Sequence, residues 1–578
     1  MRKRWRQSLA DYRMLPVILL FSLVLNLWGN RWGAPNIWNP DEVTERAMEM
    51  VANRTLNPHY FAYGGLHYYT VAVGAIIPAK IYGRLFDPKP VENDTLACAQ
   101  QYEREQARTI QIARVIAAIM SMLVVAFTFF IGASLFDKQV GYLAALFLTV
   151  SMSFVGIAHF AKVDAPGNFW YWLSCVFGLL IWKQGNRRWY VLAALTAGLA
   201  IGVKTDRVLI LFPLLLSHFL RREGLQIRKL LWSVLLVITG FVVANPTLVF
   251  SFFEFCDGYT RELFFNASRD EPRQISSYIL MLEYMKSGLG WPLFIAALAG
   301  LAHGLFLLAR RRNSAAILWL LATFLPYYLI FGSKYIVDIY LPLLFPPLLI
   351  LAAKAGMDLQ RALPPRFGLA VKAGIGAIVV YSFFYTLALI LQFSNDSRLQ
   401  ASKWIEQHVP ANATIEMLKR GPVVSKEKYH VHFVRTDQGH YDFAKHWRDN
   451  LAHNHAYQKV RQAIINLEHW LGRFGFPVRK QPYLAWYDMA IALSERPAGF
   501  ISNGDEVRKR QPDYVVLVNY LQEKTLAALQ APDSGYRLVA QFHFVNRFGW
   551  QPSLEMVNPE VSVFQREGVV LYFAGKKD

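Results

Sequence analysis

The sequence predicts an α-helical polytopic membrane protein of about eleven spans, followed by a soluble α/β domain. Of its 578 residues, 54% are hydrophobic and only 18% are charged, whereas soluble domains carry roughly 25% charged residues. Apolar runs of about 15 to 28 residues, the length that a bilayer requires, recur between residues 14 and 394. From residue 395 onward, helix-like and strand-like segments alternate with polar loops, which is typical of a soluble α/β domain.

The apolar runs give candidate spans at 14–29, 109–136, 139–161, 166–183, 188–203, 207–220, 230–247, 288–309, 314–332, 336–353 and 367–393. We interpret residues 189–219 as two short spans that turn at "KTDR", because a single helix would place three charges near the bilayer centre at about 2.5–3.5 kcal/mol each. Residues 66–86 are long enough to cross, but a span there would invert every later loop. We therefore predict juxtamembrane or re-entrant helices for this segment.

The basic residues between the spans predict the orientation. Positive clusters lie before residue 14 and at 183–188, 221–229, 310–312 and 354–366, and the positive-inside rule places them in the cytoplasm. The opposite loops are 30–108, 162–165, 204–206, 248–287, 333–335 and everything after 394. We therefore predict a transmembrane domain at 1–394, with a first outer loop at 30–108, and an extracytoplasmic α/β domain at 395–578. The net charge of +20 then belongs largely to cytoplasmic loops, and no nucleic-acid-binding signature is present.

Ionisable residues collect in the predicted outer loops, where they are costly and usually functional. The candidate acids are Asp41, Glu42 and Asp164, and the candidate phosphate-binding residues are Lys204, Arg207, Lys334, Tyr335 and Arg269. Acids beside lysines and arginines favour an anionic ligand together with proton chemistry. A sugar on a lipid phosphate fits, because the cations would neutralise charge on the leaving phosphate and a carboxylate could act as general base.

Each of these residues also has a structural interpretation. Asp41 could cap a helix that begins near Val43, and Asp164 could be an acid in the first turn of a helix. The "KTDR" segment could be an interfacial turn with snorkelling side chains, and Lys334 could be an interfacial anchor. No His/Cys cluster has metal-binding spacing; a divalent cation held by Asp41 and Asp164 is left open.

The ordered motifs also resemble a known superfamily. They are "NPDE" at 39–42, "LNPHYFAYGGLHYY" at 56–69, "AKVDAP" at 161–166, "AGLAIGVKTDRVLILFPLLL" at 197–216, "KYIVDIYLPLLFPPLLILAA" at 334–353 and "SRLQASKWIEQHVPANATI" at 397–415. In this order they resemble the GT-C glycosyltransferases of the protein O-mannosyltransferase and aminoarabinose transferase (ArnT-like) type. Relatives have prolines where this chain reads "YGGLHYY". The basic residues of their phosphate site do not align cleanly, so Lys204, Arg207 and Lys334 are inferred from position.

The resemblance implies transfer of a sugar, with inversion, from a polyprenyl-phosphate donor to a lipid, glycan or protein acceptor. The transfer would take place on the outer face of a bacterial inner membrane. Asp41 matches the catalytic base, Glu42 is its pair, and Asp164 matches the second acidic motif. Two other functions remain alternatives: a flippase or transporter of lipid-linked sugars, and a non-catalytic protein of envelope-polysaccharide assembly. Transporters usually carry charges near mid-membrane within broken helices, whereas here the charges gather at one face.

The C-terminal domain is expected to contain a mixed sheet. Predicted strands are "PDYVVLVNYL", "YRLVAQFHFV" and "GVVLYFAGK", and predicted helices are "QASKWIEQHV" and "AYQKVRQAIINLEHWLGRF". Its role stays open between covering the outer mouth of the membrane domain and recognising the acceptor.

Overall fold

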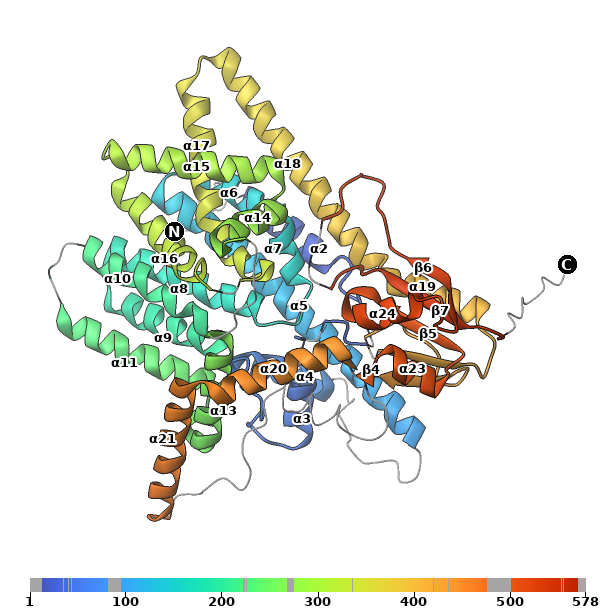
Figure 1. Cartoon of the computed structure of the whole chain (residues 1–578). Coiled ribbons are helices and arrows are strands. Elements are labelled where there is room, and N and C mark those ends of the chain that lie inside the picture. The colour runs from blue at the N-terminus through green and yellow to red at the C-terminus, as the bar shows by residue number, and fades with distance from the viewer. Residues whose placement is uncertain are drawn as a thin grey trace.

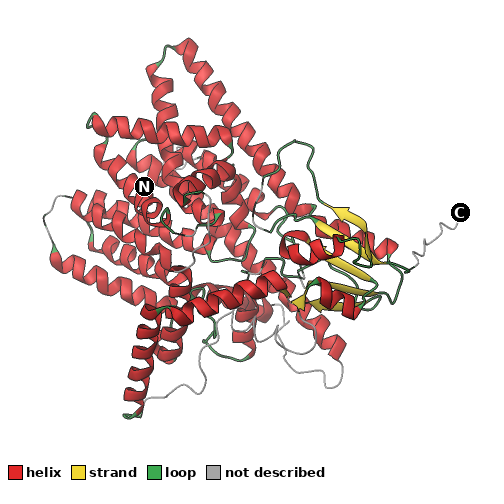
Figure 2. Cartoon of the chain, in the orientation of Figure 1, coloured by secondary structure: helices red, strands yellow, loops and turns green. Residues whose placement is uncertain are grey.

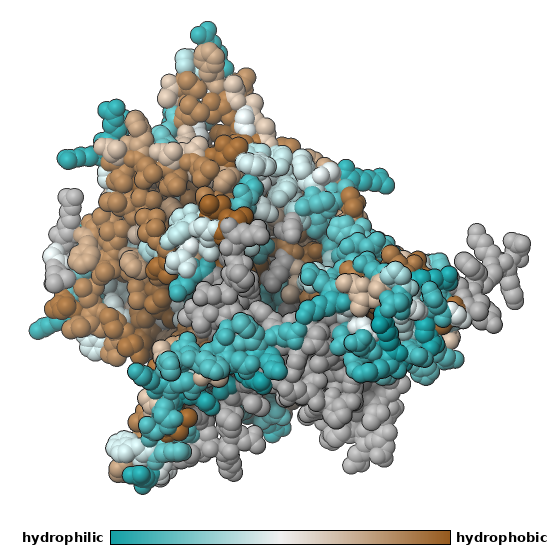
Figure 3. Space-filling view, viewed as in Figure 1, coloured by the Kyte–Doolittle hydropathy of each residue, from teal (hydrophilic) through white to brown (hydrophobic). Residues whose placement is uncertain are grey.

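The computed structural model describes residues 13–569, except 35, 40, 43, 82–94, 222–223, 225, 268–274, 335, 419, 435, 476–500, 553 and 555. Helices make up most of this part of the chain, and strands gather at one end, beside the C-terminus (Figures 1 and 2). The space-filling view shows an apolar surface over the helical part and a hydrophilic one over the strand-containing part (Figure 3). This division agrees with a membrane-embedded helical part followed by a water-exposed unit.

The helical part begins with α2 and ends with α18. Its elements are α2 (Met14–Leu27), α3 (Thr44–Ala52), α4 (Gly65–Ile81), α5 (Thr95–Leu135), α6 (Lys138–Thr149), α7 (Met152–Ala158), α8 (Asp164–Gln184), α9 (Arg187–Val203), η1 (Thr205–Ile210), α10 (Leu211–Leu220), α11 (Ile227–Ala244), α12 (Thr247–Phe250), α13 (Phe252–Ala267), α14 (Ser277–Leu289), α15 (Trp291–Ala309), α16 (Ser314–Phe331), η2 (Asp338–Leu344), α17 (Phe345–Ala362) and α18 (Pro365–Ser394).

Six helices among the described residues are long and apolar enough to cross a membrane, or up to seven if a bent pair counts as one span. The six are Glu105–Leu135, Ile227–Ala244, Trp291–Ala309, Ser314–Phe331, Asp338–Ala362 and Pro365–His408. Multi-pass character is therefore confirmed, while the number of about eleven spans stays a prediction. The candidate span at 139–161 is bent, because α6 and α7 meet at an angle of 65°.

Local sequence explains where several helices start and stop. The side chain of Asp137 accepts hydrogen bonds from the backbone N–H groups of Gln139 and Val140, which caps the start of α6. Helix α8 ends at Gly185, whose φ of 66° suits glycine. The predicted break in 189–219 is confirmed, since α9 ends at Val203 and α10 begins at Leu211 after a short 3₁₀ turn.

Small residues let the helices approach closely. A Cβ atom on Gly198 of α9 would overlap the carbonyl oxygen of Val237 on α11, and one on Gly300 of α15 would overlap the backbone of Ala352 on α17. The largest core cluster packs α5, α6, α8 and α14 to α17 around fully buried rings such as that of Trp319. These contacts fix the ends of α7, α8 and α9, which carry the candidate site.

Residues 395–569 form an α/β unit, which we call the C-terminal unit. Its helical elements are α19 (Ser397–His408), α20 (Gln438–His453), α21 (His455–Gly472), α23 (Gly504–Arg510), η3 (Asn519–Leu521) and α24 (Glu523–Gln530). Its strands are β1 (Thr414–Leu418), β2 (His430–Val434), β3 (Thr436–Asp437), β4 (Ile501–Ser502), β5 (Tyr514–Val518), β6 (Tyr536–Phe542) and β7 (Val561–Arg566). The main sheet has the order β2-β1-β5-β7-β6. Strand β1 runs parallel to β2 and β5, and β7 runs antiparallel to β5 and β6, so the predicted mixed sheet is confirmed.

Candidate active site

The candidate site lies where α8 begins and α9 ends. Lys204 leaves α9 in an extended conformation, and its Nζ atom lies 2.7 Å from Oδ1 of Asp164, the first residue of α8. The same ammonium group lies 3.8 Å from the centre of the Tyr340 ring, on η2. A buried carboxylate, a lysine and an aromatic face from three separate segments therefore meet at one point.

Asp41 of the first loop is connected to these side chains through Lys162, which lies in the turn between α7 and α8. Lys162 Nζ lies 2.8 Å from Asp41 Oδ2, and 38% of the Asp41 side chain is exposed against 3% of Lys162. Desolvation raises the pKa of the Asp41 carboxyl, but the Lys162 cation and a hydrogen bond from the Tyr63 hydroxyl outweigh it, so the pKa of Asp41 is lowered. Asp41 is therefore ionised at neutral pH.

A third pair lies on the other side of Lys204. Arg207 donates from Nη1 to Asp206 over 2.8 Å and from Nη2 to Asn168 over 2.9 Å. Asp206 also accepts a hydrogen bond from the hydroxyl of Tyr327 at 3.1 Å. Because Lys204 lies 4.0 Å from Asp206, this pair is continuous with the pair that Lys204 forms with Asp164.

These side chains form one sequence of alternating charge, which we call the charged row. Its members, in order, are Asp41, Lys162, Asp164, Lys204, Asp206 and Arg207. Lys162 acts electrostatically on both Asp41 and Asp164, which links the first pair to the second. The row holds three acids and three bases and so has no net charge in its ionised form. The structure thus brings together Asp41, Asp164, Lys204 and Arg207, as the sequence predicts.

Glu42 has a different environment from its neighbour Asp41. It is fully buried, and its two carboxylate oxygens accept from Nε and Nη2 of Arg114 on α5, at 2.8 and 2.7 Å. The backbone N–H of Ala161 donates to it as well, at 2.7 Å. Arg114 in turn donates to the carbonyl oxygens of Asn30 and Trp32 in the first loop. Glu42 therefore joins the first loop, α5 and the turn before α8, and so holds Asp41 and Lys162 in place.

The remaining predicted residues lie elsewhere or outside the description. Lys334 lies exposed in the turn after α16, and among the described residues no ion pair joins it to the charged row. Tyr335 and Arg269 fall outside the described residues. Sequence reasoning gave no role to Tyr340, and it did not single out Arg114. A lone arginine inside a predicted span was nevertheless a signal, because such a charge is costly unless it is paired.

Glycines explain the departure "YGGLHYY" in the first loop. A Cβ atom on Gly64 would overlap the carbonyl oxygen of Gly202 in α9, and the N–H of Gly64 donates to the carbonyl of Val203 at 3.1 Å. The N–H of Gly65 donates to the side chain of Asn245 at 2.8 Å, and Asn245 donates to Gly202 at 3.2 Å. The first loop therefore lies directly on the end of α9, next to Lys204.

The C-terminal unit covers the first loop. The indole N–H of Trp32 donates to Asp396 at 2.8 Å, and that of Trp38 donates to the carbonyl of Gly421 at 3.0 Å. The guanidinium of Arg398 lies 4.0 Å from the Trp38 ring centre. Arg420, next to Gly421, acts electrostatically on Asp41, and burial lowers the pKa of this guanidinium. The unit therefore adds a cation to the site that the sequence did not predict.

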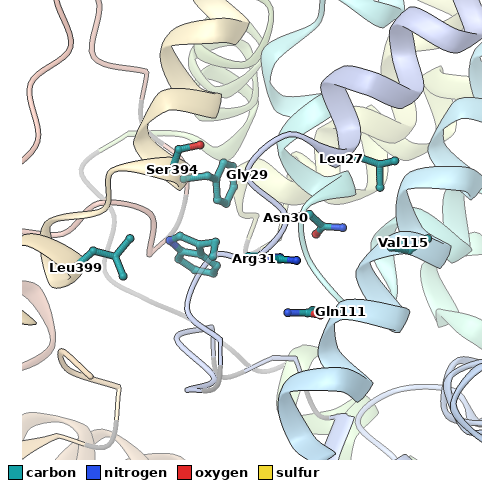
Figure 4. A pocket seen from close by; sticks show the side chains of 10 residues that line it. Leu27, Gly29, Asn30, Arg31, Gln111, Val115, Ser394 and Leu399 are labelled. Atoms are coloured by element: carbon teal, nitrogen blue, oxygen red, sulfur yellow. The ribbon is translucent and has the colours of Figure 1, made fainter. Parts of the chain in front are cut away.

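A cavity of about 500 Å³ lies beside this loop, on the side of α2, α5 and the end of α18 (Figure 4). Its polar lining includes Asn30, Arg31 and Gln111, and its apolar lining includes Leu27 and Val115. The cavity shares the Asn30–Trp32 segment with the Arg114 anchor, but none of its lining residues belongs to the charged row. It is therefore a neighbour of the site and not its centre.

The acids of the site do not fit a divalent cation. Asp41 and Asp164 each hold a lysine ammonium group at hydrogen-bonding distance, where a hard metal ion would need several free oxygen ligands. Within the described part of the chain, no group of three or more His, Cys, Asp or Glu side chains could hold a metal ion. His159 instead contacts the carbonyl oxygens of Val155 and Trp28, at 2.9 and 2.8 Å.

The chain is similar to known proteins in its fold and in one segment of its sequence. No curated protein sequence matches the chain. Among solved structures, it is similar to ArnT from Cupriavidus metallidurans bound to undecaprenyl phosphate, at 16% identity and a TM-score of 0.46, over 69% of this chain and 72% of that one. It is also similar to the oligosaccharyltransferase AglB from Archaeoglobus fulgidus in complex with an inhibitory peptide and a dolichol-phosphate, at 13% identity and a TM-score of 0.46, over 90% and 72%.

A family model also matches the segment that carries most of the charged row. The family is the dolichyl-phosphate-mannose-protein mannosyltransferases, and the match covers residues 107–250. That range contains Lys162, Asp164 and Lys204 as well as the Arg114 anchor. Over this segment, the resemblance to protein mannosyltransferases that the sequence predicts is confirmed.

Proposed function

We propose that the protein is an integral-membrane glycosyltransferase that moves a sugar from a polyprenyl-phosphate donor to an acceptor on the outer face of a bacterial inner membrane. The observation that carries this proposal is the charged row, in which an ionised, partly exposed Asp41 adjoins the buried Lys162 and the half-buried Lys204 pairs with Asp164. The family match at 107–250 supports the reaction class, and the apolar helices support a multi-pass membrane location. The C-terminal unit would then be periplasmic.

In the proposed reaction, the acceptor hydroxyl attacks the anomeric carbon of the donor from the face opposite the phosphate. A bond forms between the acceptor oxygen and that carbon, while the bond from the carbon to the phosphate oxygen breaks with inversion. The electron pair of the broken bond stays on the phosphate, and the acceptor proton passes to Asp41. Asp41 is suited to this role because it is ionised and 38% of its side chain is exposed.

The cations of the row have a matching role. When Asp41 takes up a proton, a row of three acids and three bases gains one positive charge. The leaving phosphate gains one negative charge in the same step, so the two changes compensate within one site. Lys162 is released from its carboxylate partner at that moment, and Lys204 lies next in the row; both could contact the phosphate. Arg207 is buried behind them and keeps Asp206 in place. Lys334, Tyr335 and Arg269 stay proposed phosphate ligands from their position in the sequence.

The test is a transfer assay with purified protein in lipid and a panel of polyprenyl-phosphate sugars, in which released polyprenyl phosphate is measured. We expect release with at least one sugar, and its loss in Asp41→Asn. Glu49→Gln is the matched control, because Glu49 is an exposed acid of the same loop that pairs with Arg46 outside the charged row. Near-normal release by Asp41→Asn would remove Asp41 from the base role. Movement of the donor across the membrane without release would favour a flippase.

A further inference from the structure

Helix α21 is held against α13 by one of its faces. The side chain of Arg261 on α13 donates from Nε to the hydroxyl of Tyr457 on α21, at 3.1 Å. Arg461 Nε lies 3.9 Å from Oδ1 of the buried Asp257. The rings of Phe264 and Tyr457 lie 5.7 Å apart. These contacts order α21 along its first two turns.

On a second face of α21, large apolar side chains are exposed. These residues, which we call the apolar stripe, are Val460, Leu467 and Trp470 on α21 and Phe474 in the turn that follows it, and they are 40%, 43%, 53% and 66% exposed. Val460, Leu467 and Trp470, separated by seven and three residues, fall on one side of the helix, and Phe474 follows four residues after Trp470. Ordinary water-exposed surfaces rarely gather aromatic and aliphatic side chains in this way, so the stripe indicates a partner.

The neighbouring elements indicate which partner. Helix α11 is a candidate membrane span, and only 11% of its apolar window is buried within the protein. The chain leaves α11 through α12 and the start of α13, where Val249, Phe250 and Phe252 are also exposed. Helix α21 therefore packs on α13, which lies a few residues beyond the end of a lipid-facing span. In Figure 3, apolar side chains recur at the foot of the molecule, where α21 projects, below the apolar surface of the spans.

The charges next to the stripe fit a membrane surface. Lys459 lies beside the stripe on the helical wheel, and Arg473 directly follows the last residue of α21; both are exposed, whereas Glu468, the acid of this helix, is buried. We propose that α21 is an interfacial helix, with its apolar stripe inserted into the outer leaflet and Lys459 and Arg473 at anionic lipid headgroups. The helix anchors the C-terminal unit to the bilayer at the level of the candidate site.

The experiment uses the full-length protein in lipid nanodiscs that contain phosphatidylglycerol. Cys98 and Cys256 are replaced by serine, and Cys175 is kept because its side chain is fully buried. One new cysteine is then introduced, either at Phe474 in the apolar stripe or at the exposed Gln462 on the polar side of α21. Each variant is labelled with an environment-sensitive NBD fluorophore and measured with and without doxyl-labelled lipids. Leu467→Cys is a second variant of the stripe.

We expect the probe in Phe474→Cys to have blue-shifted emission and to lose at least about half of it to doxyl lipids, because an interfacial helix places its apolar face roughly 5–10 Å into the leaflet. The probe in Gln462→Cys should keep water-like emission and lose little. Equal quenching at the two sites, or water-like emission at Phe474→Cys and Leu467→Cys, would overturn the proposal. A blue shift without quenching would overturn it in favour of a protein partner.

Discussion

Removing the charge of Asp41 and removing the charge of its neighbour Glu42 should have different effects on stability and on transfer activity, and both effects can be measured. Glu42→Gln removes the charge that neutralises Arg114, and both side chains are fully buried. Removing one partner of a buried pair costs about 3–5 kcal/mol. Arg114 keeps its bonds to two backbone carbonyls, so we expect the lower end of that range. Asp41→Asn should cost less, because 38% of the Asp41 side chain is exposed and the buried Lys162 still faces the Asp164 carboxylate.

The measurement is thermal unfolding of the purified variants in one detergent, alongside the transfer assay. We expect Glu42→Gln to unfold several degrees below the parent protein and to keep transfer in its folded fraction. Asp41→Asn should unfold closer to the parent temperature than Glu42→Gln does, and it should show no transfer. The double variant Glu42→Leu with Arg114→Met should recover part of the lost stability, because it leaves no unpaired charge. Unfolding of Glu42→Gln at the parent temperature would refute the anchoring role that we assign to Glu42.

Three further outcomes follow from the geometry around the site. Lys162→Gln should raise the pKa of Asp41, because desolvation then acts without the neighbouring lysine cation. The acid limb of the pH–rate profile should move to higher pH, and an unchanged limb would contradict the pairing. Burial lowers the pKa of His67 from 6.5 to about 4. Between these two pH values the unfolded chain binds more protons than the folded protein, so the folded protein loses stability as the pH falls from 6.5 to 4. His67→Gln should remove this loss of about 3 kcal/mol, which would be seen as a flatter dependence of the unfolding temperature on pH. Gly64→Ala should lower both unfolding temperature and transfer, because the new methyl group meets α9, whereas Gly374→Ala, where the added carbon meets nothing within 4 Å, should change neither.

The gathering of charged residues was predictable from the sequence, because ionisable side chains at membrane depth are energetically costly and usually have a function. Asp41, Asp164 and Lys204 stand out in this way. Their pairing was beyond the sequence, because it depends on how three turns face each other. Lys162 is two residues from Asp164, yet its ion pair is with Asp41, and Asp164 takes Lys204 instead.

The C-terminal unit shows a similar limit to what the sequence alone can predict. Strand β5 was predicted because "YVVLV" is apolar throughout and is buried at every position. Strand β1 was missed, since Glu416 stands at its centre; the strand tolerates this buried acid because Arg510 donates to both of its oxygens, at 2.6 and 2.9 Å. The last strand was predicted at 568–576, largely outside the described residues, whereas the sheet uses Val561–Arg566.

The two indole bonds from the first loop, Trp32 to Asp396 and Trp38 to Gly421, bear on how the protein can be divided. A fragment that stops after Ser394 would retain the helices of the membrane part, but two buried tryptophans would lose their acceptors and the loop bearing Asp41 would lose its cover. A fragment that starts there would leave Arg398 without the aromatic face on which it rests. Each part depends on contacts with the other, so the helical part and the C-terminal unit should be expressed and assayed as one polypeptide.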